Sequence, residues 1–176
     1  MCAEVDVSWV RPLVIGVGNR FRRDDGAGPA VVSYLLTDSA GIAAADLMEA
    51  DGEAARLVEL WDGRPLVVVV DAAVLPGRDA GEVVVLQGST ALDPGRVGSW
   101  NAGVSGHNAG LSEAVALGRT LGRLPEELVI VGIVAADLSA GEEMSRPVAE
   151  AVGSAVEVVR ERLAAHERSG GSDVSV

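Results

Sequence analysis

Residues 12–36 read PLVIGVGNRFRRDDGAGPAVVSYLL, and this stretch predicts the first unit of an α/β fold. The apolar run at 13–15 is long enough for a buried strand and too short for a helix. Two glycines after it allow a tight turn. From Pro29 the apolar residues recur at helical spacing, and a proline just after aspartates is typical of a helix start. We therefore predict a strand, a glycine loop that carries Asp24 and Asp25, and a helix.

The glycine loop also raises the alternative of a nucleotide-binding α/β protein. A dinucleotide fingerprint needs a third glycine three residues after the second, and Phe21 occupies that position. Asp24 and Asp25 would repel a pyrophosphate, and the absence of any Lys excludes a Walker A loop. In the purely structural interpretation the glycines make a turn and the aspartates cap a helix. We adopt that interpretation for Asp24, and a functional one for Asp25.

Composition excludes several other classes of protein. A chain of 176 residues fits one domain, and its net charge of −12 argues against nucleic acid or an anionic membrane as a partner. All 14 basic residues are Arg, which excludes a catalytic Lys, and the single cysteine, Cys2, excludes an internal disulfide and a Cys-based zinc site. No secretory signal and no apolar run of ~20 residues is visible. We expect a cytoplasmic protein that acts as a monomer.

Strands alternate with helices along the chain. Apolar or β-rich runs predict strands at 13–15, 42–50, 66–70, 82–87 and 128–134, with 82–87 as an antiparallel edge. Helical spacing predicts helices at 29–36, 54–61, 106–122 and 148–166. Most strands are too apolar for one-sided burial, so we predict a three-layer α/β/α sandwich with a mixed, mostly parallel sheet of about five strands. This single domain spans 12–166, between a flexible lead-in at 1–11 and a disordered tail at 167–176.

Residues 88–105 form a long stretch without periodicity. It is rich in glycine and contains Trp100, a residue type enriched at interfaces. Loops of this length are usually functional or disordered. We expect the loop to border the functional site and to hold a partner's chain, with a disordered connector as the alternative.

Three side chains could converge at the C-terminal edge of the sheet. If the first strand neighbours the 66–70 strand, a crevice opens between their C-terminal ends, with Asp25 and Asp71 facing each other across it. His107 lies at a predicted helix start, where the helix dipole favours the neutral imidazole that binds metals. Each of the three also has an ordinary structural interpretation, as a cap or a core residue.

Two carboxylates and one imidazole would leave coordination positions open for water or substrate, as catalytic metal sites do. This mixed oxygen and nitrogen set suits a divalent ion such as Ni²⁺ or Zn²⁺. Other constellations are poorer: GVSGH at 103–107 lacks the spacing of a nucleophile elbow, and His166 lies near a helix end where a cation is simply favourable. Asp25, Asp71 and His107 are therefore our candidate metal ligands and catalytic residues.

At these residues the chain resembles the nickel–iron hydrogenase maturation proteases. GVGNRFRRDDGAG at 16–28, VVVDA at 68–72 and SGHNAGL at 105–111 carry the resemblance, with a weaker match at 132–152. It spans roughly residues 12–165, and the family's metal-binding positions fall on Asp25, Asp71 and His107. One departure concerns the loop Asp51-Gly52-Glu53, which is commonly Asp-Gly-Gly-like in the family and helps to shape the crevice.

The resemblance implies an endopeptidase that removes the C-terminal extension of a hydrogenase large-subunit precursor. The family recognises nickel already inserted in the precursor, so Ni²⁺ would arrive with the substrate, and Zn²⁺ or another divalent ion could replace it in isolation. Asp24 could assist as a base. A nickel or client chaperone that binds the precursor without cutting it remains the alternative, and a nucleotide-binding protein is a more distant one.

Overall fold

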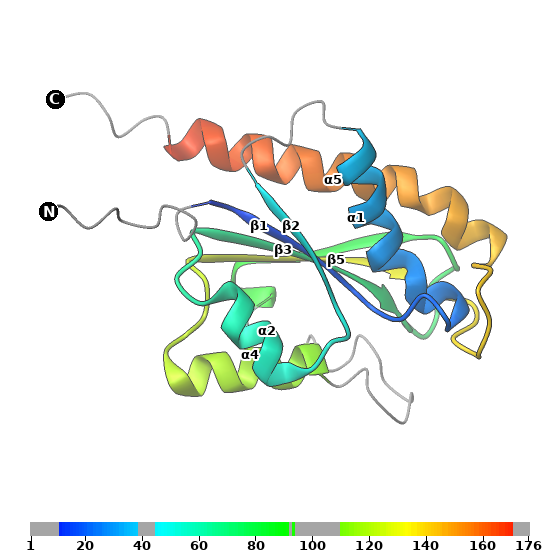
Figure 1. Cartoon of the computed structure of the whole chain (residues 1–176), viewed down its shortest axis with the longest axis horizontal. Helices are drawn as coiled ribbons and strands as arrows, with labels where there is room; N and C mark the ends of the chain where they lie inside the picture. The colour runs from blue at the N-terminus through cyan, green and yellow to red at the C-terminus, as the bar shows by residue number, and fades with distance from the viewer. Residues whose placement is uncertain (1–10, 39–44, 92, 94–109, 171–176) are drawn as a thin grey trace, which may run out of the picture.

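Five strands form one sheet in the computed structural model, which describes residues 11–38, 45–91, 93 and 110–170 (Figure 1). They are β1 (Leu13–Val17), β2 (Asp46–Ala50), β3 (Leu66–Ala73), β4 (Val83–Gln87) and β5 (Glu127–Val134). Their order is β2-β1-β3-β5-β4, and all neighbours are parallel except β4, which runs antiparallel to β5. The mixed sheet and its antiparallel edge strand, both predicted from the sequence, are confirmed.

Helices cover both faces of this sheet. Those of the described chain are α1 (Ala27–Thr37), α2 (Ala54–Trp61), α4 (Gly110–Leu121) and α5 (Arg146–Gly170), with short 3₁₀ helices η2 (Arg23–Gly26) and η3 (Gly88–Thr90). Helices α1 and α5 lie on one face, and α2 and α4 on the other (Figure 1). The predicted three-layer sandwich is therefore confirmed. No helix within the described ranges is long and apolar enough to cross a membrane.

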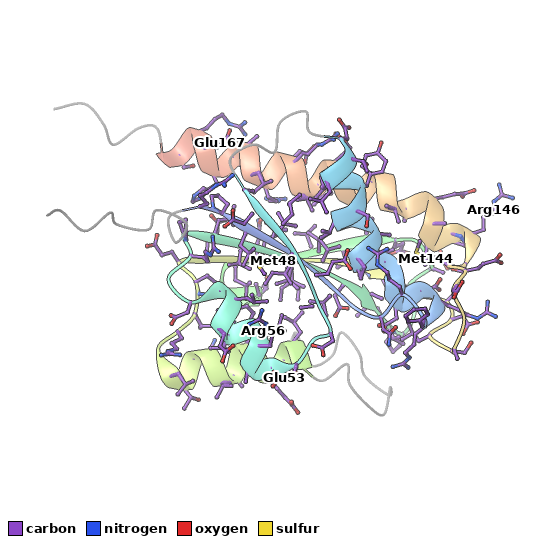
Figure 2. All side chains as sticks on the ribbon, viewed as in Figure 1. Met48, Glu53, Arg56, Met144, Arg146 and Glu167 are labelled. Atoms are coloured by element: carbon purple, nitrogen blue, oxygen red, sulfur yellow. The ribbon has the colours of Figure 1, made fainter. Side chains whose placement is uncertain are left out.

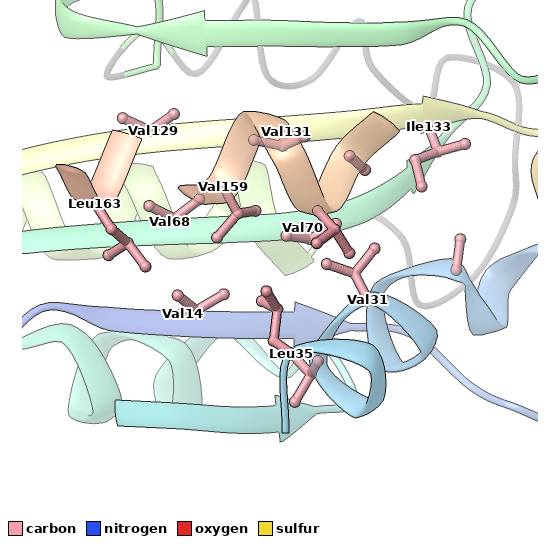
Figure 3. Close-up of a cluster of buried hydrophobic side chains, with 14 of the residues drawn as sticks. Val14, Val31, Leu35, Val68, Val70, Val129, Val131, Ile133, Val159 and Leu163 are labelled. Atoms are coloured by element: carbon pink, nitrogen blue, oxygen red, sulfur yellow. The ribbon is translucent and has the colours of Figure 1, made fainter. Parts of the chain in front are cut away.

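Strand β3 is buried along its whole length because successive side chains enter opposite layers. Val68 and Val70 pack in a cluster with side chains of α1 and α5, among them Leu35 and Val159 (Figure 3). Val67 and Val69 enter a second cluster, which contains residues of α2 and α4 such as Trp61 and Val115. A continuous apolar run thus serves two cores, as expected of a central parallel strand.

Some boundaries differ from those predicted. Strand β1 extends to Val17, two residues further than expected, and the described part of the 42–50 strand begins at Asp46. Helix α5 runs to Gly170 instead of ending near 166, so residues 167–170, expected in the tail, are helical. No proline follows the first turn of α5, and Glu and Arg near its end are good helix formers.

The strand order creates a crevice at the C-terminal ends of β1 and β3. The chain leaves β1 through α1 to reach β2 on one side, while β3 pairs with β1 on the other. Ligands of open α/β sheets bind at such a reversal of strand order. The expected adjacency of the first strand and the 66–70 strand is confirmed.

Gly28 brings the start of α1 against the ends of both strands. A Cβ at this position would overlap the carbonyl oxygens of Val17 and Val70, and neither backbone atom can move without shifting a strand. We expect Gly28→Ala to lower the free energy of unfolding by about 3 kcal/mol. Gly153→Ala is the matched control, because a Cβ there meets nothing within 4 Å on an exposed helix face.

The control should raise stability by about 1 kcal/mol through helix propensity. Urea unfolding of both variants measures the difference. A loss below ~1 kcal/mol for Gly28→Ala would show that α1 does not have to approach the strand ends this closely.

Candidate active site

A cleft of about 790 Å³ opens at the C-terminal ends of β1 and β3. Its described walls come from the end of β1, the 3₁₀ helix η2, the 51–54 loop, β3 and the first turn of α4. Asp25 of η2 and Asp71 of β3 both line it. The structure therefore brings two of the three candidate residues to one site.

Asp71 is a buried carboxylic acid near the end of β3, with 5% of its surface exposed. Burial, together with the nearby charge of Asp25, raises the pKa of Asp71 to about 8. A hydrogen bond from the Ala72 backbone acts in the opposite direction. Repulsion between the two close carboxylates thus contributes to the raised pKa of Asp71, but burial is the larger cause.

Asp25 is also buried, and its carboxylate is held from the β1 end of the loop. The backbone N–H of Asn19 donates to Oδ2 of Asp25 at 3.1 Å. Burial raises the pKa of Asp25, while the Arg22 guanidinium and the Asn19 hydrogen bond lower it. Helix α1 begins after Gly26 without a side-chain cap. The structural interpretation of Asp25 as a helix cap is therefore wrong.

Asp24 lies outside the cleft, although it is the neighbour of Asp25. Its fully buried carboxylate accepts hydrogen bonds from Ala136 N (2.8 Å), Asp137 N (2.9 Å), Ser145 N (2.6 Å) and Ser145 Oγ (3.0 Å). A carboxylate with four donors has no role as a general base, so that expectation is wrong. Asp24 is structural, as we expected, but it anchors a distant loop and does not cap a helix.

That loop, residues 135–145, is hydrogen-bonded to the backbone of η2 and the residues before it, and we call these contacts the brace. The backbone N–H of Arg23 donates to Gly141 O at 2.8 Å, and Gly141 N donates to Phe21 O at 2.9 Å. Arg23 takes a left-handed conformation, with φ of 47°, which is uncommon for a residue other than glycine. The brace fixes the segment that carries Asp25. Sequence patterns did not reveal it, because its partners lie more than 100 residues apart in the chain.

Comparison with known proteins identifies the family. The family model of HycI, hydrogenase maturation protease, matches residues 29–162. This chain belongs to the hydrogenase maturation protease family. No curated protein sequence matches the chain closely enough to refine that assignment.

Solved structures of maturation proteases share the fold. The [NiFe] hydrogenase maturation protease HybD from Thermococcus kodakarensis is 26% identical, with 88% of this chain and 99% of that chain covered at a TM-score of 0.66. The hydrogenase 2 maturation peptidase from Thaumarchaeota archaeon SCGC_AB-539-E09 is 28% identical, with 87% of this chain and 97% of that chain covered at a TM-score of 0.61. The hydrogenase maturating endopeptidase HybD from E. coli is 24% identical, with 92% of this chain and 94% of that chain covered at a TM-score of 0.74. At this identity the similarity supports the fold alone.

The third candidate residue of this maturation protease, His107, lies outside the described residues, as does Trp100 with most of the 88–105 loop. Within the described ranges, no three His, Cys, Asp or Glu side chains lie close enough together to hold a metal ion. The described chain resumes at Gly110, which lines the cleft and starts α4. The convergence of Asp25, Asp71 and His107 therefore stays a prediction.

The departure from the family's Asp-Gly-Gly-like loop has a structural explanation. The carboxylate of Glu53 accepts hydrogen bonds from Ala55 N (3.0 Å) and Arg56 N (2.9 Å), so it caps the start of α2 (Figure 2). Gly52 keeps a positive φ of 85°, and a Cβ on Gly110 would overlap its carbonyl oxygen. The loop and the start of α4 therefore form one wall of the cleft.

The described lining of the cleft is strongly acidic. It contains five carboxylates, from Asp25, Asp51, Glu53, Asp71 and Glu113, and one guanidinium, from Arg22. A concave surface with charges of one sign concentrates ions of the opposite sign. The arrangement favours a cation over a phosphate, which also argues against the nucleotide-binding alternative.

Proposed function

We propose that this maturation protease cuts the C-terminal extension from the large-subunit precursor of a nickel–iron hydrogenase after nickel insertion. The observation that carries the proposal is the pair Asp25 and Asp71, two buried carboxylates that share an acidic cleft at the sheet edge. Family membership supports the proteolytic chemistry. The negative cleft supports recognition of a metal ion presented by the client.

In this proposal Asp25, Asp71 and His107 bind the nickel that the precursor carries in. Two residues lie between His107 and the cleft residue Gly110, so the Cα atoms of these two residues can be at most ~11 Å apart. A cation between the carboxylates would replace the proton that burial and repulsion retain on Asp71. Zn²⁺ or another divalent ion could occupy the same ligands in the isolated protein. The chemistry that such a metal supplies is polarisation of a carbonyl or activation of water.

The test compares nickel-loaded with nickel-free precursor. We expect the wild-type protein to shorten only the nickel-loaded precursor, with a mass loss equal to the extension. His107→Ala should abolish this processing, because two carboxylates alone form an incomplete ligand set. His166→Ala is the matched control: its imidazole lies 3.8 Å from the Glu127 carboxylate, near the end of α5. Mass spectrometry of the products measures all four reactions.

The same experiment separates the alternatives. A stable complex with the nickel-loaded precursor and no mass loss would support the non-cleaving chaperone. Processing that ignores nickel, or that survives His107→Ala, would contradict the role given to the metal. A nucleotide-binding protein would instead be stabilised thermally by nucleotide and indifferent to loss of His107.

A further inference from the structure

Side-chain N–H donors are few among the described residues that line the cleft, although hydrolysis of a peptide bond requires hydrogen-bond donors. Attack on the carbonyl carbon places negative charge on the carbonyl oxygen, and fixed donors aimed at that oxygen stabilise the transition state. The five cleft carboxyl groups are acceptors when ionised, and in the proposed function Asp25 and Asp71 face the metal ion. Asn19 and Arg22 alone among the described lining side chains carry N–H donors for this purpose.

The amide of Asn19 is oriented by its own loop. The backbone N–H of Phe21 donates to Oδ1 of Asn19 at 2.9 Å, which requires the oxygen on that side and leaves Nδ2 on the other. No described residue accepts a hydrogen bond from Nδ2. The backbone N–H of Asn19 donates to the carboxylate of Asp25, so the position of Asn19 is also fixed relative to this candidate metal ligand.

The guanidinium of Arg22 is fixed by the brace. Both Nε and Nη2 donate to the carbonyl oxygen of Leu138, at 3.3 and 3.2 Å. Nη1 has no partner among the described residues. The backbone N–H of Arg22 donates to Asn19 O at 3.0 Å, which closes a turn between the two donors. One short, braced turn therefore carries both of these cleft-lining residues.

A cation in this position opposes the capture of a metal ion by the acidic cleft, but it suits an oxygen atom that becomes negative during the reaction. We propose that Asn19 and Arg22 bind the carbonyl oxygen of the scissile peptide bond and stabilise the negative charge that it acquires. The inference rests on the proposed proteolytic function. It makes both residues catalytic, because they would touch a reacting atom.

The step balances with water as the only co-reactant. The water oxygen bonds to the carbonyl carbon, and the π pair of the carbonyl moves onto the oxygen held by Asn19 and Arg22. The water proton passes to a cleft carboxylate and from there to the leaving nitrogen. The carbonyl then re-forms as the C–N bond breaks, which leaves a carboxylic acid on the mature subunit and an amine on the released extension. The acid passes the second proton of the water to the amine, which gives a carboxylate and an ammonium group.

The competing explanation gives Arg22 a purely electrostatic effect on Asp25, whose pKa its charge lowers. We would measure single-turnover cleavage of nickel-loaded precursor from pH 6 to 9, with protein in saturating excess. Arg22→Gln and Asn19→Ala should each lower the limiting rate by about 10²–10³-fold at every pH, with little change in half-saturating concentration. Arg22→Lys keeps the positive charge but lacks the two N–H groups that donate to the Leu138 carbonyl oxygen. Its cleavage rate should therefore stay low.

Arg20→Gln is the control for charge. Arg20 belongs to the same loop but pairs with Glu49 and Ser33 and does not line the cleft, so its variant should cleave at close to the wild-type rate. Thermal unfolding of each variant checks that it is folded. If Arg22→Gln does not fold, the cleavage rate of Asn19→Ala still tests the inference.

Restoration of the wild-type rate by Arg22→Lys, or by high pH in Arg22→Gln, together with a wild-type rate in Asn19→Ala, would overturn the inference while the proposed function stands. Failure of the wild-type protein to cleave would overturn the proposed function, and the inference with it.

Discussion

Asp71→Asn should abolish precursor processing and, at the same time, stabilise the fold at neutral pH. The asparagine amide cannot supply the negative charge that a nickel ligand needs, so the mass loss of the precursor should disappear. Its neutral side chain has nearly the same shape, and it escapes the penalty for burying a charge. One substitution should therefore move activity and stability in opposite directions.

The pKa of Asp71 gives the sign of the stability effect. Burial and, to a smaller extent, the charge of Asp25 raise this pKa from an ordinary value of 3.8 to about 8 in the folded protein. Between these values the unfolded chain has released a proton that the folded chain retains, so stability falls as the pH rises. At ~1.4 kcal/mol per pH unit, the loss by pH 7 is on the order of 4 kcal/mol.

Urea unfolding at intervals from pH 4 to pH 8 measures this effect. The wild-type free energy of unfolding should decline across the window relative to Asp71→Asn, which lacks the titrating group. Asp79→Asn is the control, since it changes an exposed aspartate and should leave the slope as in wild type. Parallel pH profiles for wild type and Asp71→Asn would contradict the burial of an unfavourable carboxylate.

Local sequence patterns were enough to predict the strands and the loop that position Asp25 and Asp71. The glycine loop between strand and helix located Asp25, and the apolar run of β3 located Asp71 at its end. Both follow from chain-local chemistry, and the rule that parallel strands share a C-terminal edge brought them together. The edge strand β4 was recognisable from its own apolar run, but its partner was not, because β4 pairs with the distant β5 and not with β3, from which only a short connection separates it.

The donor side of the site could not be predicted in the same way. Leu138, which fixes Arg22, lies 116 residues further along the chain, and no local pattern announces that contact. The left-handed Arg23 gave no signal either, because turn rules lead one to expect glycine or asparagine there. What the sequence left open was a set of long-range contacts to the 135–145 loop.

Asp24→Asn tests that loop, and it should be strongly destabilising. The buried carboxylate accepts four hydrogen bonds, and an amide would turn an N–H group toward at least one backbone donor. A buried donor left without an acceptor costs about 1–3 kcal/mol, and hydrogen bonds to a charged acceptor are stronger than those to a neutral one. We expect the free energy of unfolding to fall by about 3 kcal/mol at pH 7.

The comparison with Asp71→Asn makes this prediction sharp. Both substitutions replace a buried aspartate by the same amide, and only the surroundings differ: four donors around Asp24, and chiefly burial and a neighbouring negative charge around Asp71. Urea unfolding should therefore show opposite signs for the two variants. In Asp24→Asn the amide protons of Ala136 and Asp137 should also exchange faster with solvent, because their acceptor has weakened. A gain in stability for Asp24→Asn would mean that the donors around Asp24 do not compensate its buried charge. A loss for Asp71→Asn would mean instead that burial of the Asp71 carboxyl is not unfavourable.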